Sequence, residues 1–444
     1  MLGHPKKLCD FLVQLANYKA PDGEQIELIL NGDFVDFLAI EPFQAWTPAE
    51  SACVHKLNEA EKQFPQVFDA FRQCIARVRY FTITLGNHDI ETALPRVTDA
   101  LLAKLGTSLK SCEFLRTNQA YRFGDLLVEH GNRYDSWNAI DHCVLQRVAS
   151  AQSRLEEPPE MDPCPGSYMV EKLVTSLRED YPFVDLLKPE NKVLPLVLSA
   201  LEPALKRDLR RFSQFSRLFV AQWARSRTWL PHITSAAEEL IGASDMDSSL
   251  PGPLRMAFKD QLTPVNEEEV SSFTKLLDIR KVFRKEGMAQ LIRDQKPLPV
   301  DRLQKLRLSL AAALQGDRTF DLDGPDGPYL EAAKRIIADG TGTRPRIVAM
   351  GHTHLRKHIA VGGMGHYLNT GTWVDLLRIS PAILETASPI EPFTEWLCQA
   401  VLDVGKLRFS DPAFADITLD DQGVLKQPEN RPLLREYGDK LFGT

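Results

Sequence analysis

Short apolar runs recur along the chain, and each is followed within two residues by a glycine and then by polar residues. Four of these runs are rich in β-branched or aliphatic side chains: residues 26–30, 80–85, 126–129 and 346–350. Their length and composition predict buried strands that end in glycine-opened loops. Two further short stretches, 358–361 and 366–368, flank a glycine-rich turn and predict a hairpin.

Between the first two predicted strands, residues 49–78 carry apolar positions near helical spacing, and Pro65 marks a break in that pattern. This segment therefore predicts one or two helices. Strand, helix and strand in this order imply a parallel, helix-covered sheet, so the chain is expected to be an α/β protein. In such sheets, sites form just beyond the carboxyl ends of the strands.

A long central segment has a different pattern. From about 158 to 340 the sequence is helical in period, rich in Leu, Arg and Glu, and poor in strand signals. We predict a helical insertion that caps the site-bearing face. The predicted organisation is thus an N-terminal core part (1–157), a helical insertion or cap (158–340), a C-terminal core part (341–410), and a polar tail (411–444) that holds a short hairpin or wraps the core.

The composition is that of an ordinary globular protein, with 43% hydrophobic and 25% charged residues and a net charge of −7. This balance gives no general attraction to nucleic acid, so no obligate nucleic-acid partner is expected. Seven scattered cysteines without a C-x-x-C pair argue against a disulfide framework and favour a reducing, cytoplasmic location. No apolar run approaches the ~20 residues of a transmembrane segment.

The polar residues at the strand ends are of the kinds that bind metal ions. The candidate ligands combine a carboxylate, an amide and three imidazoles: Asp33, Asn87, His130, His352 and His354. This mixed oxygen and nitrogen set suits Mn²⁺, Fe or Zn²⁺ better than Ca²⁺. Two such ions can share a carboxylate and a hydroxide that attacks phosphorus in line. Gly32, Gly86 and Gly351 would allow the backbone to approach the ions closely.

Four motifs carry a specific resemblance: GDFVD (32–36), GNHD (86–89), HG (130–131) and GHTH (351–354). In this order, each at a strand end, they resemble the calcineurin-like metallophosphoesterase superfamily. The resemblance covers about half the chain. It implies a β-sandwich flanked by helices and a dinuclear centre, expected to hold two Mn²⁺ ions, that hydrolyses phosphomonoesters or phosphodiesters. The helical insertion matches no part of that pattern.

The resemblance also implies roles for individual residues. Asp33 would bridge the two ions, the second ion would be completed by Asn87, His130 and His352, and His354 would bind the first. His88 would be the general acid near the leaving oxygen. Asp36 and Asp89 would support these groups, with Asp89 holding the His88 imidazole in its useful tautomer.

One departure from the family pattern concerns the first metal site. The family opens with a strand and an Asp-x-His motif, whereas this sequence begins MLGHP. Three explanations are compatible with this difference. The start is misassigned or truncated, His4 substitutes as a ligand, or the chain is a one-metal or inactive relative.

Other segments support weaker functional interpretations. Arg133, with Tyr134 and Asp135, follows a ligand strand and is a candidate phosphate contact, the alternative being a solvated loop. Asn369-Thr370-Gly371-Thr372 is interpreted as a structural turn, with substrate contact second. Residues 206–230 interleave arginines with aromatic residues, which fits either an ordinary cap helix or a basic lid that contacts a membrane surface.

Three functions follow from these interpretations. The leading one is a hydrolase for a phosphorylated small molecule, nucleotide or lipid. Protein serine/threonine phosphatases are disfavoured, because Phe37-Leu38 and Asp89 stand where their Arg-Gly and Glu would be. The alternatives are a non-catalytic binding or regulatory relative, and a nuclease acting on DNA ends, which would require a continuous basic groove.

Overall fold

The computed structural model describes residues 5–21, 23–117, 119–135, 137–178, 180–201, 288–338, 344–385, 387–428 and 431–437. The chain divides into two compact units. The first comprises Met1–Tyr168, Phe320–Asp375 and Ser410–Thr444, and the second comprises Met169–Thr319 and Leu376–Phe409. Among the helices described, none combines the length and the apolar character needed to cross a membrane.

The first unit contains a parallel three-stranded sheet in the order β1-β2-β3, formed by Glu27–Asn31, Tyr80–Thr84 and Glu113–Leu115. Strands β1 and β2 are the first two predicted strands. Five helices accompany this sheet: α1 (Pro5–Asn17), α2 (Glu50–Gln63), α3 (Pro65–Ile75), α4 (Pro95–Lys104) and α5 (His142–Ser153). Pro65 is the first residue of α3, which confirms the predicted break, since proline fits the first helical turn.

A second, five-stranded sheet has the order β4-β5-β7-β9-β8. Its strands are β4 (Tyr121–Phe123), β5 (Leu126–Val128), β7 (Ile347–Met350), β8 (Arg356–Val361) and β9 (Gly365–Thr370). The three central strands are parallel and the two outer pairs are antiparallel. The predicted strands β5 and β7 and the predicted hairpin β8–β9 are therefore confirmed.

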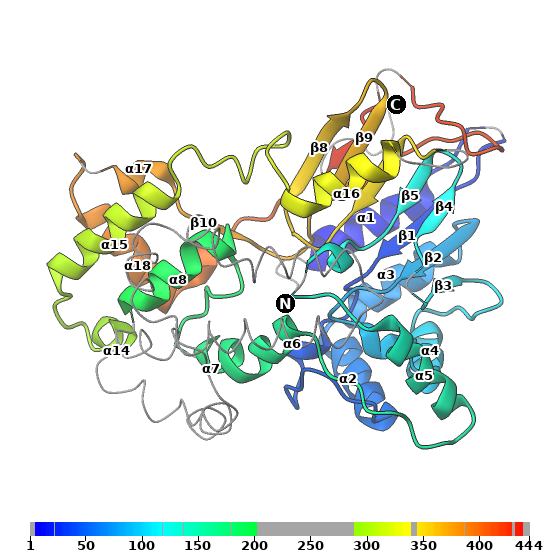
Figure 1. Cartoon of the computed structure of the whole chain (residues 1–444), viewed down its shortest axis with the longest axis horizontal. Helices are drawn as coiled ribbons and strands as arrows, with labels where there is room; N and C mark the ends of the chain where they lie inside the picture. Colours follow the sequence, from blue (N-terminus) through cyan, green and yellow to red (C-terminus); the bar gives the residue numbers. More distant parts are fainter. Residues whose placement is uncertain are drawn as a thin grey trace. The chain divides into compact units, whose positions relative to one another are not determined.

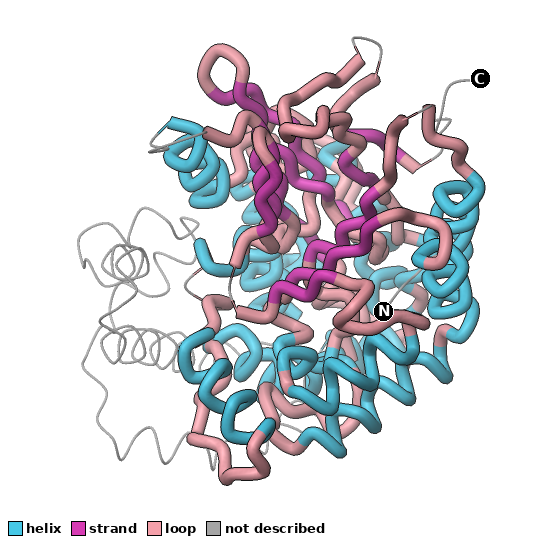
Figure 2. Tube along the Cα trace, turned by 90° about the vertical axis from the view of Figure 1, so that its right-hand side faces the viewer, coloured by secondary structure: helices cyan, strands magenta, loops and turns pink. Residues whose placement is uncertain are grey.

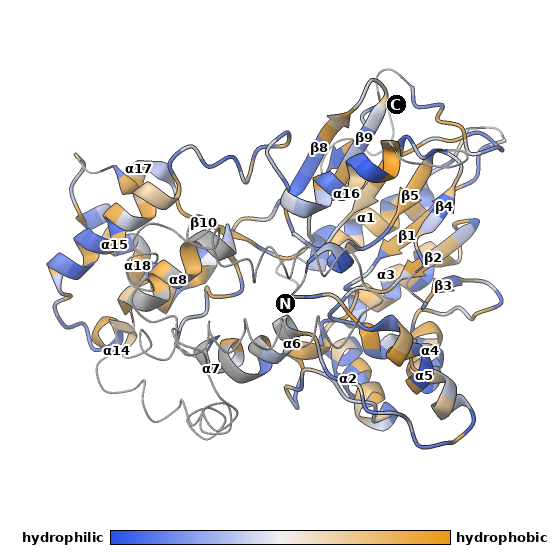
Figure 3. Cartoon of the chain, viewed as in Figure 1, coloured by the Kyte–Doolittle hydropathy of each residue, from blue (hydrophilic) through white to orange (hydrophobic). Residues whose placement is uncertain are grey.

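Three apolar clusters place the sheets and helices in layers. One cluster joins residues of both sheets, including Ile29 of β1 and Leu368 of β9, so the two sheets share a core. Another packs helices α1 to α5 against β1 and β2. The third buries Ala333 of α16 (Gly327–Ala338) against β7 and β9. Figure 1 shows α16 beside β8 and β9, and Figure 2 shows the strands, in magenta, lying together with helices on either side. In Figure 3, β1 and β5 are largely hydrophobic, whereas α16 carries both kinds of residue.

The second unit is mainly helical. Its described elements are η4 (Val170–Val174), α7 (Thr175–Arg178), β6 (Leu187–Lys188), α8 (Glu190–Leu201), α14 (Met288–Arg293), α15 (Val300–Ala313), β10 (Leu377–Arg378), α17 (Pro381–Leu384), α18 (Glu391–Leu402) and η6 (Val404–Lys406). The short helix α6 (Pro165–Met169) lies at the division. Strands β6 and β10 pair in parallel, and one apolar core joins α8, α15 and α18.

The boundaries of the units differ from the predicted ones at three places. Residues 158–168, expected in the insertion, lie in the first unit, where Met161 and Cys164 join the apolar core around β1 and β2. Residues 320–340, expected in the insertion, lie in the first unit because α16 buries its apolar side on the five-stranded sheet. Residues 376–409, expected in the core, lie in the second unit because α18 packs into the helical core. In the tail, β11 (Ala413–Ala415) pairs antiparallel with β12 (Leu434–Glu436). His4 and residues 206–230 lie outside the described residues.

Candidate metal centre

The candidate site lies in the first unit, at the carboxyl ends of β1, β2, β5 and β7. Asn31, the last residue of β1, ties three of these strands together: its Oδ1 accepts from Thr84 Oγ1 at 3.0 Å, and its Nδ2 donates to the carbonyl of Glu129 at 2.9 Å. The next link joins β5 to β7, because Gly351 N donates to the carbonyl of His130. Four loops distant in sequence are thus held at one edge, as the sequence predicted.

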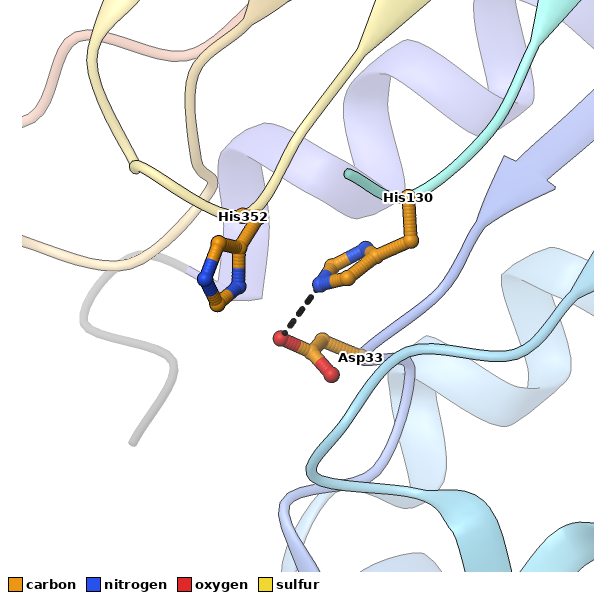
Figure 4. A group of neighbouring side chains, drawn as sticks. All are labelled: Asp33, His130 and His352. Atoms are coloured by element: carbon orange, nitrogen blue, oxygen red, sulfur yellow. Dashed lines mark ion pairs between the residues drawn. The ribbon is translucent and has the colours of Figure 1, made fainter. Parts of the chain in front are cut away.

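Asp33, His130 and His352 direct one possible ligand atom each toward a common space, and these atoms all lie within 4.8 Å of one another. Figure 4 shows the three side chains converging from three separate segments. Nε2 of His130 lies 3.1 Å from Oδ2 of Asp33. The two histidine ring centroids are 5.4 Å apart. A carboxylate and two imidazoles with this spacing suit a divalent transition-metal ion.

The backbone at these residues is held in an unusual conformation. Asp33, His352 and His354 have φ of 52°, 67° and 65°, and they make up three of the five described non-glycine residues with positive φ. Each such residue costs of order 1–3 kcal/mol and persists only where the surroundings hold it. The concentration of this strain at predicted ligands is a mark of a functional site.

Two glycines make the close approach of the loops possible. A Cβ added to Gly32 would lie 2.6 Å from His130 Nδ1 and 2.7 Å from Gly86 N. A Cβ added to Gly86 would overlap the carboxylate and backbone of Asp33. Glycine is thus required at both positions because any larger residue would push the two loops apart, whereas the predicted reason, close approach of the backbone to metal ions, stays a prediction.

Two buried polar atoms at the site have no hydrogen-bond partner. They are Oδ1 of Asn87 and Nε2 of His130, whose contact with Asp33 lacks hydrogen-bond geometry. The opposite side of each group is already engaged: Asn87 Nδ2 faces Asn138 Oδ1 at 3.4 Å, and His130 Nδ1 lies 2.8 Å from the carbonyl of Asn31. Buried polar atoms are rarely left unpaired, so these two fit an ion as their partner.

A polar chain connects His352 to Asn87. Nε2 of His352 lies 3.1 Å from Asp135 Oδ2, and the same oxygen accepts from Asn138 Nδ2 at 2.7 Å. Asn138 in turn meets Asn87. Carboxylates that hold a ligating histidine in this way fix its orientation and tautomer. The sequence gives no signal for Asn138, and it indicates Asp135 only as a possible substrate contact, because loop residues carry no periodic signal.

His88 is held by Asp36 and not by Asp89, which corrects the predicted role. Nδ1 of His88 lies 3.0 Å from Asp36 Oδ1. Asp89 instead accepts from the backbone N–H groups of Gly86 and Phe34, both at 2.8 Å. Asp89 therefore shapes the two loops, while Asp36 orients the imidazole. The reason is local: each Asp89 oxygen already accepts a hydrogen bond from a backbone amide of the turns that surround it.

The charges at the site depend on one another. Burial would raise the pKa of the Asp33 carboxyl, but His130 and His88 hold it well below its usual range. Burial favours a neutral His88, whereas Asp36 and Asp33 raise its pKa to about 10. Burial, with the charge of Asp33, raises the pKa of Asp89 to about 6. A divalent cation would replace ring protons as the partner of the carboxylate, with proton release.

Two of the predicted site residues, His354 and Arg133, are not among the three side chains that converge. His354 does not belong to the cluster formed by Asp33, His130 and His352 in the described part of the chain. Arg133 lies on η3 (Asn132–Tyr134), its guanidinium 3.6 Å from Glu129 and stacked near the Tyr134 ring. Glu129 also accepts from Tyr134 Oη at 2.6 Å. Arg133 thus has a carboxylate partner, and its 40% exposed side chain keeps contact with solvent.

No protein-family model, curated protein or solved structure matches the chain in comparisons with known proteins. The resemblance to metallophosphoesterases therefore rests on the four motifs. The function is inferred from the site and from those motifs.

Proposed function

We propose that this protein hydrolyses a phosphomonoester or phosphodiester with the help of a divalent metal ion. Asp33, His130 and His352 would hold the ion, together with the amide oxygen of Asn87. The observation that carries the proposal is the convergence of three ligand side chains beside two buried, unpartnered ligand atoms. The order of the four motifs and the helix-flanked pair of sheets support a calcineurin-like sandwich.

The donor set favours Mn²⁺, Zn²⁺ or Fe. When bound, such an ion would activate water and neutralise charge on the phosphoryl oxygens. A single ion would be enough to explain why Asp33, His130 and His352 converge. A second ion, and a role for His354 in binding it, rest on the resemblance alone.

His88 is the candidate general acid. Because Asp36 engages Nδ1, the Nε2–H remains to donate a proton to the leaving oxygen of the ester. Its backbone N–H donates to Asp33 Oδ1 at 2.9 Å, which links the position of the acid to that of the central carboxylate. Removal of such an acid lowers turnover by about 10²–10⁴-fold.

The test is a hydrolysis assay on the full chain with Mn²⁺. Substrates would be p-nitrophenyl phosphate, bis-p-nitrophenyl phosphate, and a panel of nucleotide and lipid phosphoesters. We expect His88→Ala to lower turnover while Mn²⁺ binding is retained, and Asp33→Asn to lower both. His55→Ala, on an exposed position of α2, is the matched control and should leave both unchanged. A chain that binds Mn²⁺ but hydrolyses no ester would indicate a binding or regulatory protein.

A further inference from the structure

The segment that presents His352 is a tight turn. Thr353 N donates to the carbonyl of Gly351 at 2.8 Å, so the hydrogen bond closes around His352 alone. With φ of 67° at His352, this is the positive-φ form of a γ-turn, which is rare because it is strained. Such a turn needs contacts from outside it to persist.

Asn369, at the end of β9, supplies those contacts. Its fully buried Nδ2 donates to the carbonyl of Gly351 at 2.7 Å and to Thr353 Oγ1 at 2.9 Å. Its Oδ1 accepts from Gly371 N at 3.0 Å. One amide group therefore binds the residues on both sides of His352 and anchors them to the following loop.

The orientation of the Asn369 amide is itself fixed. Asp326, just before α16, is buried, and its Oδ2 accepts from Tyr367 Oη at 2.5 Å. The same oxygen lies 3.4 Å from Asn369 Nδ2. A carboxylate at this position favours the amide nitrogen facing the turn and disfavours the flipped amide.

We infer that Asn369 is a positioning residue of the proposed metal centre. It holds the strained His352 turn so that the imidazole faces Asp33 and His130, and it thereby sets the affinity of the centre for metal. The inference rests on the proposed function. It assigns a specific role to a residue that the sequence indicated as part of a structural turn, with substrate contact as the alternative.

The test is a titration of the full chain with Co²⁺, followed by its visible absorption spectrum, which reports the geometry and number of the ligands. Asn369→Asp keeps the shape of the side chain and Oδ1 but removes both donated bonds. We expect at least a tenfold weaker Co²⁺ affinity and a changed spectrum. Thr353→Val, at a partly exposed position, removes the bond from Asn369 to Thr353 Oγ1 but leaves the bond to the Gly351 carbonyl, so it should give a smaller change in the same direction. It is the variant to use if Asn369→Asp does not fold.

The control for simple loss of stability is Thr82→Val. Thr82 of β2 is equally buried and donates to Glu27 at 2.6 Å, but it touches no predicted ligand. It should unfold more easily and bind Co²⁺ as the wild type does. Wild-type affinity and spectrum in Asn369→Asp, or in Thr353→Val where that is the variant used, would overturn the inference and leave the proposed function standing. A wild-type chain that binds no Co²⁺, Mn²⁺ or Zn²⁺ would overturn both.

Discussion

Gly86→Ala tests the close packing of the two loops that carry Asp33 and His88. Gly86 has no positive φ, so the new methyl group adds no backbone strain of its own. It would, however, overlap the backbone N and the carboxylate of Asp33. The overlap can be relieved only if the two loops separate, and this separation also breaks the hydrogen bond from His88 N to Asp33 Oδ1.

The expected cost follows from these two contributions. Overpacking in a tight core costs about 1–3 kcal/mol, and a hydrogen bond to a charged group contributes about 1.5–3 kcal/mol. We therefore expect Gly86→Ala to lower the free energy of unfolding by about 3–5 kcal/mol. Because Asp33 is displaced, Mn²⁺ affinity should fall at least tenfold.

Urea denaturation of the metal-free protein, with Mn²⁺ titration of the folded state, measures both effects. Gly363→Ala is the matched control, because a Cβ there meets nothing within 4 Å and Gly363 has no positive φ. It should change stability by no more than about 0.5 kcal/mol. A Gly86→Ala protein with the stability and Mn²⁺ affinity of the control would refute the described contact between the two loops.

Three further changes have defined outcomes. Burial, together with the positive charge of Arg133, lowers the pKa of His142 to about 4. As the pH falls below 6.5, the imidazole is therefore protonated in the unfolded state but stays neutral in the folded state, which favours unfolding. Between pH 6.5 and 4, the free energy of unfolding of the wild type, measured by urea denaturation, should fall by about 3 kcal/mol relative to that of His142→Gln. A difference between the two proteins that stays constant over this pH range would contradict the prediction. Lys56 is fully buried and donates to the carbonyl of Phe37 at 2.9 Å, so Lys56→Met should lower the free energy of unfolding by about 1.5–3 kcal/mol, seen as a lower melting temperature. An unchanged melting temperature would show that the hydrogen bond of Lys56 does not contribute to stability. Asp36→Asn should reduce kcat at least tenfold with Mn²⁺ binding retained, and equal kcat would exclude its role in orienting His88.

The four strands that precede the motifs were predictable because their signals are local, whereas the short strands β3 and β4 were not predicted. An apolar run ending at a glycine and a polar motif occurs at β1, β2, β5 and β7, and each predicted strand is present within about a residue. The partners of helices were not predictable in this way. The pattern of α16 shows an apolar side, but only the tertiary structure reveals that it covers β7 and β9 instead of joining the helical unit.

The candidate site was also predictable only in part from local sequence signals. Asp33, His130 and His352 were predicted together because each follows a strand, and strand ends gather at one edge. The side chains that hold them were harder to assign. Asp89 is adjacent to His88 in the sequence and Asp36 lies 52 residues away, yet it is Asp36 that contacts the imidazole, because the Asp89 oxygens accept from backbone amides. Asn369 lies in a turn whose composition alone indicates only a turn.

The central claim is tested most directly by the rate of bis-p-nitrophenyl phosphate hydrolysis as a function of Mn²⁺ concentration, for the wild type and Asp33→Asn. We predict a rate that saturates with Mn²⁺, disappears with a chelator, and falls at least a hundredfold in Asp33→Asn. A hydrolysis rate that does not depend on Mn²⁺, or that Asp33→Asn leaves unchanged, would contradict the proposed metal-dependent phosphoesterase.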